Sequence, residues 1–517
     1  MAGVGAVVDS PRRLCKNAFG YSEIYIRCFI FKQQNLKTLL MRYHRGNSRY
    51  QQSFLSIDDQ ISKANLVRIV DDICEEFCTN ITTEKGIKDT GRKAYHPADL
   101  LKILVYGYFN GISSSRKLER ETQRNIELKW LTSDVSPDHK TISDFRKDNP
   151  ELVDKLFKHL IIRFKEEGLI TGKSIAVDGT KIKAYASKEL NIETIRHKLD
   201  GIEQQVEKYL KDLEVLDKAE DEVEELEKKK AELEKELQAL DQKRKEYLRL
   251  EANLEAIGEK RISTTDGDSK VMSGRYGNYW GYNVQSAVES ENHFIVAVEV
   301  TNRQNDKGLL NPMVEISEEA TKQRPEETLA DAGYYKITEL EELEKDGTEC
   351  FVAINRTPSQ ANDQTHGLKF TYHQGDNSYS CSEGKSLKYF RKKTVDGRLV
   401  KVYKGSECHL CPMRTKCTTG EQRTVQRNEN QEWIDSFHEK MHGIEGKEKL
   451  IKRRSMVEHP FGTIKYHMGQ IPFLLRGRKK VQTEMNLYAI GYNLRRYLNI
   501  LGIQNPKSRK TNLRLAF

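Results

Sequence analysis

The sequence predicts a multidomain α/β protein in which a mixed sheet with flanking helices follows an N-terminal all-α domain. Three observations lead to this prediction. Early segments of the chain repeat apolar residues every three or four positions, which is the period of an amphipathic helix. Short β-like apolar runs and helical segments then alternate up to about residue 360. A long segment of heptad pattern interrupts them and predicts an inserted coiled coil.

Length and composition exclude several classes of protein. At 517 residues the chain exceeds one compact core, so several domains are expected. Hydrophobic residues make up 37% and charged residues 32%, and no apolar run approaches the length of a membrane span. The chain begins without an apolar signal core, which favours a cytoplasmic protein. Residues 1–40 match nothing that follows, and we interpret them as a start-site extension before Met41.

The helical region at residues 41–170 is the predicted DNA-binding domain. Within it, Ser136–Arg146 has the pattern of a turn that enters a short helix. In a helix-turn-helix, His139, Lys140 and Arg146 would reach a DNA groove. Ordinary packing of a capped short helix explains the same pattern.

Residues 191–257 are predicted to form an antiparallel coiled-coil hairpin. Apolar residues fall in a heptad from Ile195 to Leu216, and a second run continues from Val223 to Tyr247. Because the chain must return to the sheet afterwards, the two helices are expected to turn near Lys218–Asp221.

The predicted catalytic core is divided by this insertion into residues 171–190 and 258–360, with C-terminal helices at 426–500. Its elements are expected in the order strand, strand, strand, helix, strand, helix, strand. They are placed at 174–177, 282–289, 294–301, 309–322, 328–330, 338–345 and 349–354.

Three acidic residues are the candidate catalytic groups. Asp178 and Asp331 follow two β-like runs, and Glu458 lies in a basic helical run. Two strands and a helix can aim three carboxylates at one point, which is what a two-metal site for phosphoryl transfer needs. Taken singly, each aspartate also fits a turn or helix cap. Glu458 also fits a surface ion pair with Arg454, and Pro460 is expected to kink or end its helix just after the acid.

Basic residues and cysteines add two further candidate sites. The segment from Arg476 to the end contains ten basic residues and one acid. Its net charge of +9 equals the net charge of the whole chain. Such a segment suits DNA, through Arg476, Arg478, Lys479 and Lys480 and a basic tail at 501–517, although a solvated tail explains it equally well. In the Cys-rich insertion at 361–425, four cysteines are spaced for a structural Zn²⁺, or are reduced thiols: Cys381, Cys408, Cys411 and Cys417.

Longer stretches around the three acids carry a family resemblance. The segments VDGTKIKA, LADAGYY and RRSMVEHPFGTIK, with YHPADLLKILVYGYFNGISSSRKLER before them and MNLYAIGYNLRRYLNI after them, resemble bacterial insertion-sequence transposases of the DDE class. The resemblance extends from about Met41 to Ile500. It implies an RNase H-like mixed sheet with flanking helices, and Asp178, Asp331 and Glu458 as the catalytic acids.

The resemblance also implies a reaction, cofactors and partners. Two Mg²⁺ or Mn²⁺ ions held by the three acids would activate water or a 3′-hydroxyl for in-line attack on a phosphodiester. The expected partners are the terminal inverted repeats of the element and a target duplex, bound by a homodimer in the bacterial cytoplasm at the nucleoid. Arg454 and Lys465 match the basic residues that flank the third acid. Where the family signature opens with Tyr, this chain has Ile451.

Two other functions fit the same residues. An RNase H-like nuclease that never joins strands would use the same three acids. A catalytically inactive DNA-binding or scaffold protein built on the coiled hairpin would keep the helical features alone.

Overall fold

The computed structural model describes residues 56–79, 95–186, 189–217, 223–274, 277–354, 370–395, 398–468 and 473–502. Contacts divide the chain into two units, Met1–Gln60 and Ile61–Phe517. The predicted extension at 1–40, the hairpin turn near 218–221 and all but two residues of the basic tail lie outside the described residues. All elements described below belong to the second unit.

The segment that precedes the sheet is helical, as its apolar repeats predict. One helix is buried along nearly its whole length, with Leu101, Leu104 and Tyr108 in the core. Residue 97 is proline, which fits the first turn of a helix because no hydrogen-bond donor is needed there. The helices are α2 (Leu66–Thr79), α3 (Pro97–Phe109), α4 (Ser115–Arg124), α5 (Ile126–Leu131), α6 (His139–Asp148) and α7 (Pro150–Glu166).

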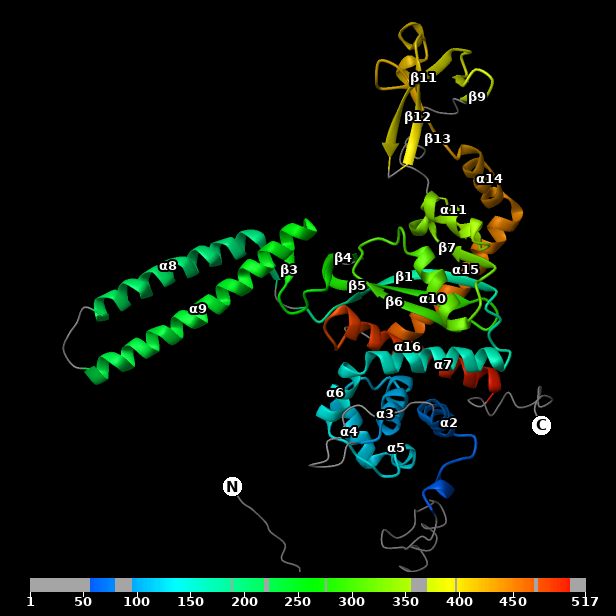
Figure 1. The fold of residues 1–517 in the computed structure, drawn as a ribbon. Helices are drawn as coiled ribbons and strands as arrows, with labels where there is room; N and C mark the ends of the chain where they lie inside the picture. The colour runs from blue at the N-terminus through cyan, green and yellow to red at the C-terminus, as the bar shows by residue number, and fades with distance from the viewer. Residues whose placement is uncertain are drawn as a thin grey trace, which may run out of the picture. The chain divides into compact units, whose positions relative to one another are not determined.

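A mixed sheet follows. The predicted strands are present, those at 174–177 and 282–289 are longer than predicted, and the strand at 270–274 was not predicted. Its order is β4-β5-β1-β7-β8, and β6 also pairs with β5 (Figure 1). β1 runs antiparallel to β5 and parallel to β7, and β7 runs parallel to β8. The strands are β1 (Ser174–Lys183), β4 (Lys270–Gly274), β5 (Gly277–Glu289), β6 (Ile295–Thr301), β7 (Glu327–Ala330) and β8 (Glu349–Val352).

Two helices link the strands of the second half of the sheet. They are α10 (Leu310–Thr321), between β6 and β7, and α11 (Ile337–Lys345), between β7 and β8. Both lie within a residue or two of their predicted positions. Of the two, α11 joins parallel neighbours, β7 and β8, which need a crossover connection of this kind.

Helix α16 (Arg478–Leu501) closes the open edge of β6. The side-chain amide of Asn493 donates to the backbone oxygen of Ile295 at 2.8 Å and accepts from its N–H at 2.9 Å. Gln482 donates to the backbone oxygen of Val298 at 2.9 Å and accepts from the N–H of Val300 at 2.6 Å. These amides satisfy strand groups that would otherwise be unpaired, so the edge cannot pair with another chain.

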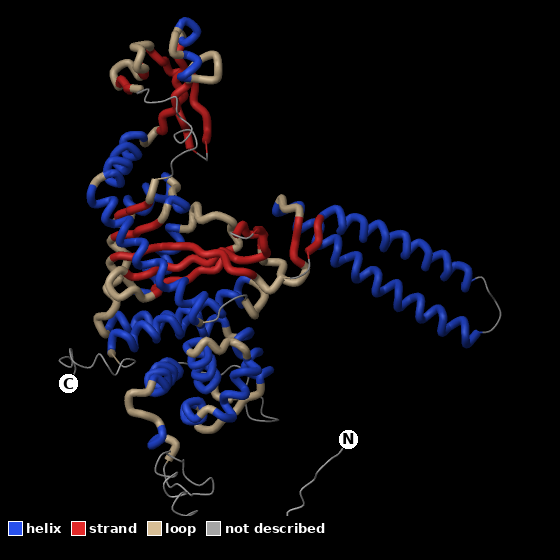
Figure 2. Tube along the Cα trace, turned by 180° about the vertical axis from the view of Figure 1, so that it is seen from behind, coloured by secondary structure: helices blue, strands red, loops and turns tan. Residues whose placement is uncertain are grey.

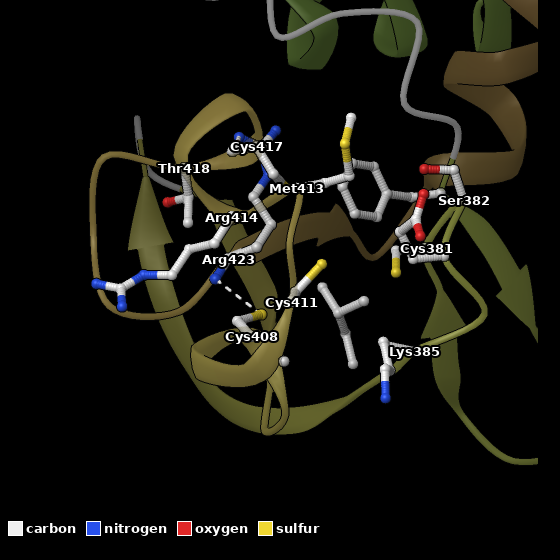
Figure 3. A pocket seen from close by; sticks show the side chains of 14 residues that line it. Cys381, Ser382, Lys385, Cys408, Cys411, Met413, Arg414, Cys417, Thr418 and Arg423 are labelled. Carbon is white, nitrogen blue, oxygen red and sulfur yellow. Dashed lines mark hydrogen bonds between the residues drawn. The ribbon is translucent and has the colours of Figure 1, made fainter.

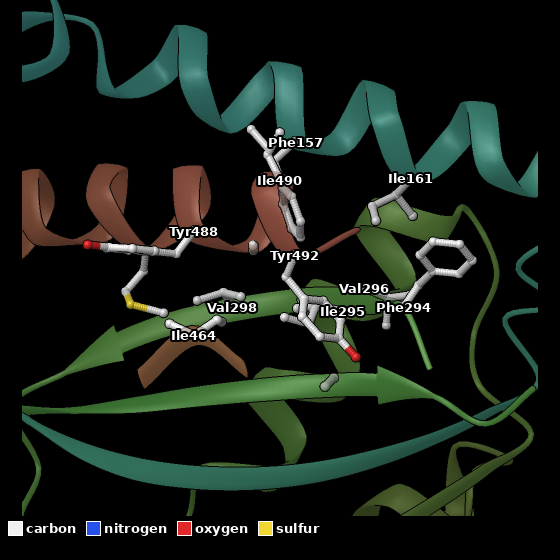
Figure 4. Close-up of a cluster of buried hydrophobic side chains, with 14 of the residues drawn as sticks. Phe157, Ile161, Phe294, Ile295, Val296, Val298, Ile464, Tyr488, Ile490 and Tyr492 are labelled. Atoms are coloured by element: carbon white, nitrogen blue, oxygen red, sulfur yellow. The ribbon is translucent and has the colours of Figure 1, made fainter. Parts of the chain in front are cut away.

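The same helix is packed between the sheet and α7. Figure 4 shows Phe157 and Ile161 of α7 beside Ile490 of α16, with Val296 and Val298 of β6 below them. Position 491 is glycine because a Cβ there would lie 3.1 Å from the backbone nitrogen of Phe109, where α3 approaches. The apolar face predicted for this segment is therefore part of the core. Its removal would open that core.

The heptad segment forms two long helices, α8 (Ile192–Asp217) and α9 (Val223–Ile257), which lie side by side (Figures 1 and 2). Ile195, Leu199 and Leu254 form a small apolar cluster between them. Arg196 pairs with Glu251 at 2.6 Å and Arg244 pairs with Glu203 at 3.3 Å, so the helices run in opposite directions. Short strands β2 (Glu189–Asn191) and β3 (Arg261–Ser263) join the pair to the rest of the chain.

The late cysteines lie in the connections of a second sheet, whose strand order is β13-β12-β11-β10-β9. Buried Leu387, Tyr379 and Tyr403 form its small core. All neighbouring strands are antiparallel. The strands are β9 (Thr371–His373), β10 (Ser378–Ser380), β11 (Ser386–Val395), β12 (Arg398–Gly405) and β13 (Thr424–Asn428).

The helix that carries Glu458 is α15 (Ile444–Gly462), which follows α14 (Gln431–His442). Pro460 was expected to kink this helix or to end it just after the acid; the helix does not end there, because α15 continues to Gly462 with Pro460 inside it. A π-helical turn, η4 (Thr463–His467), follows directly. A wider helical turn of this kind is a local distortion of the type that a nearby proline favours. No helix in the described residues is long and apolar enough to cross a membrane.

Candidate active site

The sheet brings the two candidate aspartates together. β1 and β7 are parallel neighbours, with Ser174 opposite Glu327 and Ala176 opposite Leu329. Two residues further along this register, Asp178 stands level with Asp331, which directly follows the last residue of β7, whereas β1 continues past Asp178 to Lys183. Carboxyl ends of parallel strands are where loops assemble ligand sites in α/β sheets.

Asp178 lies in an environment that disfavours its charge. Its side chain is 26% exposed, and burial raises its pKa to about 6. The Arg453 guanidinium opposes this rise, whereas the carboxylates of Asp331 and Asp306 add to it. A raised carboxyl pKa beside other carboxylates marks a place where a bound cation would be favoured.

Asp331 was interpreted from the sequence either as a catalytic acid or as a helix cap, and its position is compatible with both roles. It caps the short helix η2 (Ala332–Tyr334), and its Oδ1 accepts a hydrogen bond from the Gly333 N–H at 2.8 Å. The cap fixes the direction of the carboxylate at the end of β7. Its second oxygen has no protein donor among the described residues.

A third aspartate, Asp306, was not predicted from the sequence. It lies in the loop between β6 and α10, and its Oδ1 accepts hydrogen bonds from Asn283 Nδ2 and Gln285 Nε2, both at 2.8 Å. The Tyr334 hydroxyl donates to Gln285 Oε1 and fixes the orientation of that amide. In the sequence, Asn305-Asp306-Lys307-Gly308 is a common turn pattern, so only its position after a sheet strand signals the site.

Two glycines show how closely Asp306 approaches the other groups. A Cβ at Gly333 would lie 2.9 Å from Asp331 Oδ1 and 3.2 Å from Asp306 Oδ2. A Cβ at Gly179, the residue after Asp178, would lie 2.8 Å from Asp306 Oδ1. Both positions therefore exclude a side chain.

Helix α15 presents basic side chains to this end of the sheet. The candidate acid on the same helix, Glu458, points away from the two aspartates. Arg453 Nη1 lies 3.7 Å from Asp178 Oδ1, and Lys449 pairs with Glu327 of β7. Glu458 is five residues beyond Arg453, about 140° around the helix, and its side chain is exposed. The predicted Arg454 is also exposed, so its neighbour Arg453, which was not predicted, provides the cation at the site.

Lys465 reaches the site from the π-helical turn. Its Nζ donates a hydrogen bond to Thr180 Oγ1, two residues from Asp178 on the same face of β1. Burial lowers the pKa of Lys465, and the Asp178 carboxylate opposes that effect. Arg453 and Lys465 therefore place two cationic side chains beside Asp178.

The other predicted DNA-binding residues differ in their exposure and in their partners. Arg146 is 3% exposed and donates to the Tyr108 hydroxyl at 3.0 Å and to the Ser113 carbonyl at 2.7 Å, so it stabilises the helical region. His139 pairs with Glu119 at 2.8 Å, and Lys140 is exposed. Four basic residues at the start of α16 are exposed: Arg476, Arg478, Lys479 and Lys480.

The four late cysteines line one cavity of about 30 Å³, together with Phe370, Leu387 and Met413 (Figure 3). All four are free thiols. The Arg423 N–H donates to Cys408 Sγ at 3.4 Å, and burial raises the pKa of Cys417. The fold thus brings Cys381 to the three cysteines that follow it more than twenty residues later.

The donor types at both places fit the expected metals. Carboxylates are the ligands that Mg²⁺ and Mn²⁺ prefer, and thiolates suit Zn²⁺. As the side chains lie, no three His, Cys, Asp or Glu residues within the described part of the chain are arranged to hold a metal ion. Binding would therefore require side chains to rotate toward each ion.

Comparisons with known proteins define the class. A family model described as a transposase domain matches residues 55–148, and one described as a transposase DDE domain matches residues 380–498. Both matches support an insertion-sequence transposase of the DDE class, as the sequence predicted.

Other comparisons add little. No curated protein matches the chain. Among solved structures, a piggyBac transposase synaptic complex with hairpin DNA is similar at 8% identity. The match covers 89% of this chain and 78% of that chain, with a TM-score of 0.28, an overlap too slight to define a common fold.

Proposed function

We propose that this transposase cuts DNA at the ends of its element and joins them to a target by metal-dependent phosphoryl transfer. The observation that carries the proposal is that Asp178, within β1, stands level with Asp331 at the end of the parallel strand β7, in a chain that matches a transposase DDE domain over residues 380–498. The partner is duplex DNA, and a homodimer is proposed because two element ends must be held together.

We infer that the catalytic core is RNase H-like. In support, β1 pairs antiparallel with β5, and β5 pairs antiparallel with β6 and with the short strand β4. Two parallel strands, β7 and β8, extend the other side of β1. Helix α11 crosses between the parallel strands β7 and β8, and the late helix α15 carries Glu458, the third acid of the proposal.

In the proposed reaction the acidic residues hold the metal ions, and the basic residues contact the phosphodiester. Two Mg²⁺ ions, when bound, would activate the attacking oxygen and stabilise the leaving oxygen. Asp178, Asp331 and Glu458 would hold these ions. Arg453 and Lys465 would neutralise the phosphodiester oxygens, because both lie on the face of β1 that holds Asp178.

Two carboxylates are candidates for the third position. Glu458 is supported by the family signature, and it would join the aspartates only after α15 turns about its axis. Asp306 is supported by its proximity to Asp331, and it is already held by two amides. We assign the metal to Glu458 and assign to Asp306 the positioning of the Asp331 loop, because the close approach at Gly333 places Asp306 against that loop.

The test compares Asp178→Asn with Asp200→Asn, an exposed aspartate on α8 that serves as the matched control. With Mn²⁺ and an element-end duplex, the first variant should lose cleavage and Mn²⁺ affinity, and the control should keep both. Equal cleavage by the two variants would refute the mechanism. Joining of the cut end to a second duplex separates a transposase from a nuclease. Absence of cleavage by the unmodified chain favours the inactive scaffold.

We also propose a structural Zn²⁺ in the cavity lined by the four cysteines. Four thiols from segments far apart in the sequence meet around one small, mostly apolar cavity. A half-buried thiol cluster of this kind gains stability when the thiols are deprotonated and share a metal.

A further inference from the structure

The two long strands β11 and β12 form a ribbon with an unusual charge. Their residues, 386–395 and 398–405 with the turn between them, contain seven Lys and Arg against one Asp. The part of the chain before Arg476 has no net charge, so this is a local excess. We call β11 and β12 the basic ribbon.

The register of the basic ribbon places like charges directly opposite each other. Lys388 pairs with Lys404, and Lys392 pairs with Lys401. On its other side, Lys401 faces Arg427 of β13, so three cations stand in one row across the sheet. Like charges in direct cross-strand pairs destabilise a sheet. The isolated fold therefore does not benefit from this arrangement.

Neighbouring acids neutralise little of this charge. In the described part of the ribbon, one ion pair is present, between Lys392 and Glu429 at 3.6 Å. Elsewhere the chain pairs its exposed cations closely, as Arg196 shows with Glu251 at 2.6 Å and Glu255 at 2.7 Å. The ribbon thus has the charge pattern of a surface that awaits an anionic partner.

Exposed apolar side chains accompany these cations. Phe390 sits where the pairing of β11 and β12 shifts, between Tyr389 and Arg391, and it is 55% exposed. The Lys404 ammonium lies 5.2 Å and the Arg391 guanidinium 5.7 Å from the Phe390 ring centre. Bulges of this type re-aim a side chain away from the regular pleat. Tyr389 is exposed by 44% as well.

The lysines do not hold the sheet together. Its core consists of Tyr379, Leu387 and Tyr403, with Phe370 and Val425 packed against them. The Tyr403 hydroxyl donates to Asn377 Oδ1 at 2.6 Å. Lysines on the ribbon can therefore be replaced without removing a core contact.

We propose that the basic ribbon is a docking surface for the phosphate backbone of duplex DNA, in addition to the active-site contacts. The inference rests on the proposed function, which supplies the partner. Phosphates would neutralise the opposed lysines, and Phe390 would contact the sugar or base edges beside them. A two-stranded ribbon has dimensions that the major groove admits, and contacts of lysine to phosphate carry no sequence preference.

The test uses the full chain, EDTA and a duplex of about thirty base pairs, so that binding is measured without cleavage. The ribbon variant is Lys388→Gln, Lys401→Gln, Lys404→Gln. The matched control, Lys211→Gln, Lys235→Gln, Lys243→Gln, removes three exposed lysines from α8 and α9. Loss of up to three phosphate contacts should weaken binding about tenfold or more near physiological salt, and flatten the salt dependence by about 2 to 3 in logarithmic slope.

A second variant separates binding from folding. Lys404→Glu places an opposite charge across from Lys388, so its melting temperature should equal or exceed that of the unmodified chain while DNA binding weakens. A fall in both would assign the lysines a structural role and overturn the proposal. Unchanged binding by the ribbon variant, an equal loss in the control, or tighter binding of RNA than of duplex DNA through the same lysines would also overturn it.

The proposed function fails in a different way. Cleavage of element ends, tested separately with Mn²⁺, does not depend on the outcome for the ribbon. A chain that binds duplex DNA through these lysines and never cleaves it would refute the catalytic proposal. A chain that cleaves but binds independently of the ribbon would refute this inference.

Discussion

Arg453 Nη1 lies 3.7 Å from Asp178 Oδ1, and the Arg453 side chain is 14% exposed. The guanidinium thus supplies part of the positive charge that the carboxylates attract. It also shows which side of α15 faces the sheet, because Lys449, one turn earlier, pairs with Glu327. Residues on that side contact β1 and β7, and Glu458 is not among them.

The raised pKa of Asp178 predicts a pH-dependent cost to the fold. Its pKa is about 6 in the folded chain and near 3.8 when unperturbed. Between these values the folded state binds more protons, so this group lowers the free energy of unfolding as pH rises through the window. The unfavourable contribution is complete above pH 6 and absent below about 4.

Asp178→Asn should therefore stabilise the metal-free protein at pH 7.5 by up to about 3 kcal/mol. The variant and the unmodified chain should converge near pH 4. Urea unfolding in EDTA at both pH values measures this difference. A variant that is less stable than the unmodified chain at pH 7.5 would contradict the assignment of Asp178 to an electrostatically costly site.

Glu458→Gln and Asp306→Asn should affect different properties. The exposed Glu458 should be dispensable for stability, and its loss should reduce cleavage by about 100-fold or more, since a metal ligand contributes several kcal/mol. Asp306→Asn should lower the free energy of unfolding by about 1–3 kcal/mol, because it disturbs the partner of two amides. Urea unfolding and cleavage rates measure both. If the Asp306→Asn variant were stable and inactive while the Glu458→Gln variant stayed active, Asp306 would be the metal ligand and the assignment of Glu458 would be wrong.

Gly333→Ala should disable cleavage through geometry alone. The new methyl group would lie 2.9 Å from Asp331 Oδ1 and 3.2 Å from Asp306 Oδ2, so at least one carboxylate must shift. A displacement of the order of an ångström can cost about 100-fold in rate. Gly375→Ala, where nothing lies within 4 Å, is the matched control and should remain active. Full cleavage activity in Gly333→Ala would show that Asp331 need not keep its position.

The cysteine cavity predicts one zinc per chain in protein purified without chelator. Metal analysis should find it, and Cys411→Ser should lose it together with thermal stability. Cys78→Ser replaces a free cysteine of α2 and should keep the metal. Zinc-free protein, or zinc retained by Cys411→Ser, would favour reduced thiols.

The sequence by itself determined the local elements and the family. The spacing of apolar residues predicted the strands next to Asp178 and Asp331 and the helices between them. A strand or helix that buries one face needs apolar residues at regular intervals along the sequence. Short motifs around the acids were sufficient to indicate a DDE transposase. The heptads likewise predicted α8 and α9, since a seam between two helices needs apolar residues at regular spacing.

Only the tertiary structure decided which side chains meet. Asp306 joins the site because β5 carries Asn283 and Gln285 beneath its loop, and no local pattern encodes that contact. Arg453, rather than Arg454, faces Asp178 because the rotation of α15 is set by what it packs against. The charge of the basic ribbon was visible in the sequence. The opposition of Lys388 to Lys404 is a property of strand register, which is fixed by pairing between residues distant in the chain.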